Sequence, residues 1–347
     1  MLDGLGDKLW HRVRGWVEAN ANHVTLKFFA DAAGEPIEPY NGYIRVYLSE
    51  GFLAQQKTWG NKHFPALHGG VSLTFVGNQQ AAFTFFDRPP EAWTTAGAQL
   101  DFPITPLVPF NGGTVEIEAA LYQASVEGPL ATAVSLVGGF ASLMGPPLAS
   151  AAAIADKVSS GLDSLFAATG NQPVLGLHYT MIAPGGGGNV LRPGYLAVIG
   201  TPEAQLGGTL SVDAGRLKID KGAGAQLVTG VDYLVVKVEC RRERDDWRLP
   251  ELDVLIRTAG ESYIRGWKDA FNDQRTDAIA RAWNSTDLAP GDRKRVALLV
   301  QQEIDGAKVL GAVPGPERSI DKIAAERLVD RTDPVLEDLS LVKLLAT

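Results

Sequence analysis

The sequence predicts an α+β protein with mainly β structure, in which a helical hairpin interrupts a β-sandwich and a helical C-terminal region follows it. Short apolar runs separated by turn residues occupy 23–124 and resume at Pro173, which is typical of a sandwich. Past Leu252 the apolar residues recur at helical spacing. A chain of 347 residues, 45% hydrophobic and 21% charged, is long and apolar enough to bury a sizeable core.

Residues 1–20 are expected to form an amphipathic helix. Charged residues, among them Asp3 and Lys8, interrupt the apolar stretch that a signal peptide needs, and the chain has a single cysteine. We therefore expect a cytoplasmic protein. The helix is expected to dock on the main domain, with a surface anchor for a membrane or a partner as the alternative. Its apolar face contains Leu2, Leu5, Leu9, Val13, Trp16 and Val17.

Residues 21–245 are expected to form the sandwich domain. Alternation of apolar and polar residues is clearest at Val24, Leu26 and Phe28, which indicates a half-buried strand. Turn residues such as those in AAGEP and DRPPE separate the runs, and the four glycines at 185–188 indicate a loop. The expected strands are VTLKFFAD, YIRVYLSE, VSLTFVGN, AAFTFFD, TVEIEAALYQ, PVLGLHYTMI, GYLAVIG, GTLSV, RLKID and DYLVVKVECRRE.

No charged residue occurs in 128–155, and this run predicts a helical insertion at 129–169. Prolines divide the run, because proline lacks a backbone donor and clashes with the preceding helical turn, so neither half can span a membrane alone. We expect a helix–turn–helix buried against the sheet. A membrane hairpin released on activation and an oligomerisation surface are the alternatives. The residues of the possible membrane hairpin are Val134, Val137, Phe140, Leu143, Met144, Pro146 and Pro147.

Residues 246–312 are expected to form helices, and 313–347 a linker and charged tail. Ile264, Trp267 and Phe271 fall at helical spacing, and DAIARAWN and GDRKRVALLVQQEI predict two more helices. The apolar residues of the tail can dock in a groove, bind a partner or form a removable cover. They are Ile320, Ile323, Leu328, Leu336, Leu339, Leu341, Leu344 and Leu345.

Charge and motifs argue against several classes of function. With 40 acidic and 32 basic residues, the net charge of −8 disfavours a phosphate-binding surface, and we expect no nucleic-acid partner. No histidine pair has metal-ligand spacing, and we expect neither a metal nor a cofactor. Cys240 is expected to be a core residue or an inert thiol, with a Cys/His hydrolase that uses His178 or His68 as the alternative.

Two aromatic stretches favour recognition over chemistry. The leading hypothesis is a non-enzymatic bacterial binding or assembly protein that contacts a protein partner or forms a homo-oligomer. One alternative is a soluble-stored, pore-forming effector that uses the hairpin at 128–169 for conditional membrane contact after its tail is cleaved or displaced. The other is an enzyme with a non-local Cys/His site. The predicted partner-binding residues are Tyr43, Tyr47, Phe52, Trp59, His63, Trp267 and Trp283.

Overall fold

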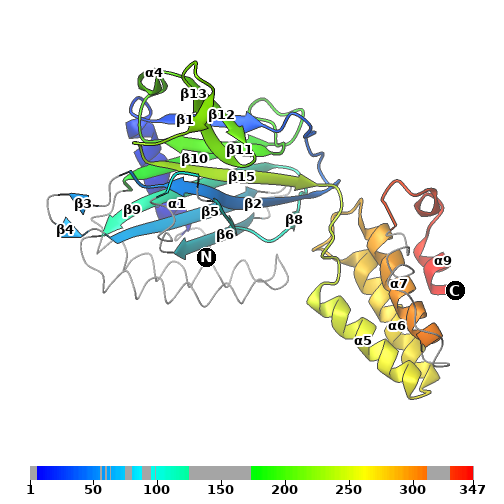
Figure 1. Ribbon diagram of the computed structural model, residues 1–347. Coiled ribbons are helices and arrows are strands. Elements are labelled where there is room, and N and C mark those ends of the chain that lie inside the picture. Colours follow the sequence, from blue (N-terminus) through cyan, green and yellow to red (C-terminus); the bar gives the residue numbers. More distant parts are fainter. Residues whose placement is uncertain are drawn as a thin grey trace. The chain divides into compact units, whose positions relative to one another are not determined.

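The protein folds into two compact units, which are seen in a computed structural model (Figure 1). The strand unit comprises Met1–Pro39 and Ile44–Cys240, and the helical unit comprises Tyr40–Tyr43 and Arg241–Thr347. The predicted α+β class is confirmed, with more strand than helix and several antiparallel sheets among the described residues. The structure describes residues 6–54, 57–58, 61–62, 64–74, 80–87, 95–97, 99–124, 173–310 and 329–346.

The largest sheet of the strand unit has six strands in the order β1, β11, β15, β2 and β7, with β8 paired to β2. The pairs β1–β11, β11–β15 and β2–β7 are antiparallel. Apolar clusters cover both faces of β11, since Leu196 and Val198 belong to one cluster and Ala197 and Ile199 to another. The continuous apolar run of this strand follows from that double burial. The strands are β1 (Thr25–Ala30), β2 (Tyr43–Phe52), β7 (Gln99–Pro103), β8 (Val108–Pro109), β11 (Gly194–Ile199) and β15 (Tyr233–Arg241).

A second, antiparallel sheet has the strand order β10, β9, β5 and β6. One core cluster contains apolar residues of both sheets, for example Val46 and Val236 of the first and Ile117 of the second. Helix α1 (Gly6–Asn20) contacts β10 and β9. The strands are β5 (Phe64–Thr74), β6 (Gln80–Asp87), β9 (Thr114–Ala124) and β10 (Leu175–Ile182).

Two small sheets complete the described part of the strand unit. The three-stranded sheet β12–β13–β14 is antiparallel and packs through Leu210 and Leu217 on the apolar cluster that contains Tyr233 and Val235 of β15. The elements are β3 (Lys57–Thr58), β4 (Asn61–Lys62), α4 (Glu203–Leu206), β12 (Thr209–Asp213), β13 (Arg216–Asp220) and β14 (Ala225–Leu227).

The helical unit is built on α5, α6 and α7, which pack against one another around a separate core (Figure 1). The predicted helical spacing of Ile264, Trp267 and Phe271 does not lie on one helix. The chain reverses at Gly266, whose φ of 74° is a left-handed conformation that favours glycine, so one helix ends and the next begins. The helices are α5 (Pro250–Ile264), α6 (Lys268–Asn284), α7 (Arg293–Leu310), the 3-10 helix η3 (Pro334–Leu336) and α9 (Leu341–Ala346).

The end of the charged tail docks on the helical core. Leu336 and Leu344 are buried in that core, and Leu339, Leu341 and Leu345 pack against it. Burial of these apolar side chains stabilises the docked tail. The other apolar residues of the predicted tail, Ile320, Ile323 and Leu328, lie outside the described residues.

The uncharged run and the possible membrane hairpin, from Val134 to Pro147, also lie outside the described residues. The interpretation of that run as core or membrane hairpin therefore stays a prediction. Among the helices that the structure describes, none combines the length and the apolar character needed to cross a membrane.

Candidate functional site

Two of the predicted partner-binding aromatics on β2 are buried. Tyr43 has no exposed surface, and Phe52 stacks on Tyr233 with the ring centroids 5.6 Å apart. Neither side chain offers a surface to a partner in this structure. Trp59 and His63 lie outside the described residues.

Tyr47, between them on β2, is half-buried and engaged within the strand unit. Its hydroxyl hydrogen-bonds to Glu239 at 3.0 Å. Two cations lie over its ring, with the Lys237 ammonium 5.3 Å and the Arg45 guanidinium carbon 5.6 Å from the ring centroid. These contacts hold the ring in one orientation.

Tyr43 is the centre of a buried polar network in the helical unit. Its hydroxyl donates to Asp292 Oδ2 at 2.8 Å and accepts a hydrogen bond from the Ala289 backbone N–H at 3.0 Å. Arg295 donates to the other oxygen of the Asp292 carboxylate at 2.5 Å, and the backbone N–H of Arg244 donates to Asp292 at 3.3 Å. Burial and the charge of Asp292 raise the pKa of Tyr43, so its hydroxyl stays protonated. The hydroxyl and the carboxylate are both satisfied, which identifies a stabilising network.

Of the predicted aromatics that the structure describes, the most exposed lies at the turn between α5 and α6. Trp267 is 54% exposed and Ile264 is 78% exposed. The Arg265 guanidinium carbon lies 4.8 Å from the Trp267 ring centroid, a cation–π distance that orients the indole. Trp283, the other predicted aromatic of this unit, is half-buried and packs against the helical core. The structure therefore separates Trp267, which a partner can reach, from Trp283, which contributes to the core.

A buried carboxyl that the sequence analysis did not identify lies on β9. Glu118 has no exposed surface, and neither of its carboxylate oxygens has a hydrogen-bond partner among the described residues. Its cross-strand neighbours are Gly70 on β5, which has no side chain, and His178 on β10. Burial, assisted by the charge of Glu116, raises the pKa of Glu118 well above its usual value. This environment favours the protonated, neutral form of the carboxyl.

The pKa of Glu116, the neighbouring carboxyl on β9, is shifted in the opposite direction. The His178 imidazole lies 3.9 Å from the Glu116 carboxylate and lowers the pKa of that carboxyl. Two glutamates on one face of a strand thus have pKa values shifted in opposite directions, because Glu116 has a hydrogen-bonding partner in His178 and Glu118 is desolvated.

Cys240 lies on β15 in the six-stranded sheet, whereas His178 lies on β10 in the four-stranded sheet. Burial, with a contribution from Glu239, raises the pKa of the Cys240 thiol to about 12. The thiol is therefore protonated at neutral pH, which is the opposite of the activation that a nucleophilic cysteine needs. Arg241 and Arg242, which follow it in the sequence, do not reverse this effect.

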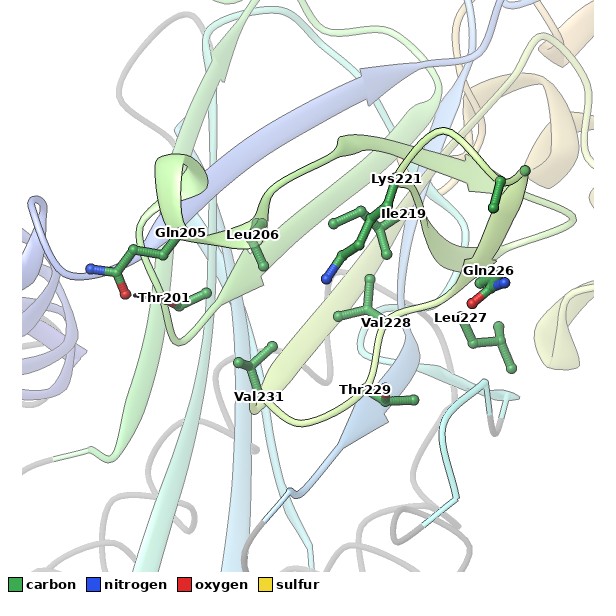
Figure 2. A pocket seen from close by; sticks show the side chains of 12 residues that line it. Thr201, Gln205, Leu206, Ile219, Lys221, Gln226, Leu227, Val228, Thr229 and Val231 are labelled. Carbon is green, nitrogen blue, oxygen red and sulfur yellow. Dashed lines mark hydrogen bonds between the residues drawn. The ribbon is translucent and has the colours of Figure 1, made fainter.

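A cavity of about 310 Å³ opens between the three-stranded sheet, α4 and the segment that precedes β15 (Figure 2). Leu206, Ile219 and Val228 line it and are buried. Lys221 points inward across the cavity, toward the side on which Val231 lies (Figure 2). A volume of this size is at the lower end of the range for small-molecule sites.

The sequence contained weak signals for these two sites. In GTVEIEAALYQ, the alternation that places Val115 and Ile117 in the core also places Glu116 and Glu118 on the opposite face. It does not show that this face is covered. The stretch DKGAGAQ indicates a glycine-rich turn, but the apolar residues that line the cavity with Lys221 come from separate segments of the chain.

Within the described ranges, no group of three or more His, Cys, Asp or Glu side chains could hold a metal ion. Comparison of the chain with protein-family models, curated proteins and solved structures finds no match.

Proposed function

We propose that this protein is a non-enzymatic bacterial binding or assembly protein that acts in the cytoplasm through protein–protein contacts. The observation that supports the proposal is the exposed pair Ile264 and Trp267 at the α5–α6 turn. Both are large apolar side chains on a short turn of a packed helical unit. A partner that covers them gains apolar burial.

The turn is suited to binding because its conformation is fixed before a partner arrives. The N–H of Gly266 donates to the carbonyl of Tyr263 at 3.0 Å, and that of Trp267 to the carbonyl of Ser262 at 2.9 Å. Arg265 orients the indole. A preorganised tryptophan beside an arginine is typical of an interface anchor, since little conformational entropy is lost on binding.

We further propose that the strand unit is a β-sandwich that acts as the scaffold. The support is the single apolar cluster shared by the six-stranded and four-stranded sheets, with Val236 on one side and Ile117 on the other. Alternate residues of β9 contribute to that cluster, as the inner faces of two stacked sheets require.

The test is a photo-crosslinking amino acid placed at Ile264, with the same amino acid at Val254 as a control. Val254 is 48% exposed on α5 of the same unit. We expect a discrete adduct, with a second copy or another protein, from position 264 alone. The adduct should be lost when Trp267 is replaced by Ser. Equal crosslinking at the two positions, or an adduct that survives Trp267→Ser, would contradict the proposal.

Sedimentation velocity distinguishes the two kinds of partner. If a second copy is the partner, the weight-average mass rises with concentration, and Ile264→Ser with Trp267→Ser abolishes that rise while Val254→Ser does not. If another protein is the partner, the purified chain stays monomeric and the adduct has a heterologous mass. A monomer without any adduct refutes the proposed function.

A further inference from the structure

The cavity beside α4 is lined by apolar side chains, by polar side chains that include Gln205, Gln226 and Thr229, and by one cation. Leu206, Ile219 and Val228 are buried side chains that line it, while Lys221 comes from the turn between β13 and β14. In Figure 2 the lysine side chain extends over the cavity instead of away from it. The arrangement places a positive charge beside three apolar side chains in a lining that also has polar groups.

The turn that carries Lys221 is held in place by its own backbone. Asp220 Oδ1 accepts hydrogen bonds from the N–H of Gly222 at 2.7 Å and of Gly224 at 3.2 Å. Both glycines have positive φ, 92° and 95°, which other residues rarely adopt. The lysine therefore starts from a fixed backbone position at the edge of the cavity.

The charge of Lys221 is not neutralised within the described residues, where its ammonium has neither a hydrogen bond nor an ion pair. The acidic residues nearby in the sequence are engaged elsewhere. Glu203 pairs with Lys27 at 2.7 Å, and Asp213 pairs with Lys218 at 2.5 Å. The Asp220 carboxylate is occupied by the backbone of its turn. An anion that enters the cavity thus meets a cation that lacks a competing carboxylate.

We propose that this cavity binds a small monocarboxylate with an aliphatic body. The carboxylate pairs with Lys221, and the hydrocarbon lies against Leu206, Ile219 and Val228. Charge complementarity selects the head group, and apolar burial supplies affinity for the tail. This site is in the strand unit and is independent of the protein contact proposed at the α5–α6 turn.

Isothermal titration calorimetry with octanoate as the probe tests the proposal, with octanol and octylamine as ligands that keep the tail and change the head group. We expect octanoate to bind more tightly than octanol, and octylamine to bind least. Lys221→Gln should weaken octanoate binding about tenfold, since the hydrogen bonds to a charged group are lost. Lys221→Arg should retain it.

Lys218→Gln is the matched control, because it removes one positive charge from β13, the strand that precedes the turn of Lys221. Its ammonium is paired with Asp213. Octanoate should bind this variant as it binds the unaltered chain. All these substitutions are at partly or fully exposed positions, and far-UV circular dichroism verifies that each variant is folded.

The proposal is overturned if Lys221→Gln binds octanoate as well as the unaltered chain does, or if Lys218→Gln weakens binding equally. The first result would make octanoate an apolar ligand bound elsewhere, and the second would indicate general attraction to positive charge. No octanoate binding at millimolar concentration would also overturn it, and the lysine would then be a solvated surface residue.

Discussion

Replacing Tyr43 by Phe should destabilise the helical unit by about 2–4 kcal/mol. The substitution removes the donor to the buried Asp292 carboxylate and the acceptor of the Ala289 N–H. A hydrogen bond to a charged group contributes roughly 1.5–3 kcal/mol, and a buried amide left without a partner costs about 1–3 kcal/mol. Asp292 keeps two other donors, the Arg295 guanidinium and the Arg244 backbone N–H. The expected loss of stability is therefore smaller than the sum of the two upper limits.

Native-state hydrogen exchange on peptides of α7 gives the free energy for this unit without requiring the whole chain to unfold in one step. At roughly 1.4 kcal/mol per factor of ten, protection of the slowest amides should fall between about 30-fold and 1,000-fold. Urea unfolding followed by far-UV circular dichroism provides an independent value, because the long helices α5, α6 and α7 lie in this unit.

Tyr47→Phe is the matched control on the same strand. Its hydroxyl bonds to Glu239 in a half-buried setting, so its loss should cost less than about 1 kcal/mol. A change below about 0.5 kcal/mol for Tyr43→Phe, or equal changes for the two variants, would refute the assignment of Tyr43 as the centre of the network.

Three further predictions concern charge and the tail. Because burial raises the pKa of Glu118 above its ordinary value of 4.5, the folded chain keeps a proton that the unfolded chain releases, and stability falls as pH rises through that interval. Glu118→Gln should therefore leave the free energy of unfolding in urea almost unchanged near pH 4 and raise it at pH 8. Glu116→Gln removes a carboxyl of lowered pKa and should lower this free energy at pH 8. A variant that changes the free energy of unfolding by the same amount at both pH values would contradict the prediction. Cys240 should react slowly with iodoacetamide at pH 8 in the native chain and quickly in urea, and Cys240→Ser should bind partners normally; rapid native alkylation would show an activated thiol. Neither the intact chain nor one truncated before Pro314 should release dye from anionic liposomes, and leakage after truncation alone would favour the membrane-active effector.

Most of the long strands could be predicted because their signals are local. Alternation at Leu26 and Phe28 and the turn residues between runs depend on neighbours in the sequence. The change to helical spacing past Leu252 is local as well. The sequence predicts Trp267 as a partner-binding residue. Its exposure, however, depends on the reversal of the chain at Gly266. The apolar residues keep helical spacing across this reversal, although they belong to two helices.

Local sequence patterns were sufficient to predict the α+β class and most of the strands and helices, although β7 (Gln99–Pro103) and α4 (Glu203–Leu206) are not among the expected elements. Tertiary structure decided which faces are covered and which distant groups meet. Tyr43 is buried because the chain brings it to Asp292, which is 249 residues away. Glu118 lies on the polar face of its strand, yet it is desolvated. The alternation of apolar and polar residues shows to which face of a strand a side chain points. Burial and pKa depend on contacts with distant parts of the chain, which a short stretch of sequence does not contain.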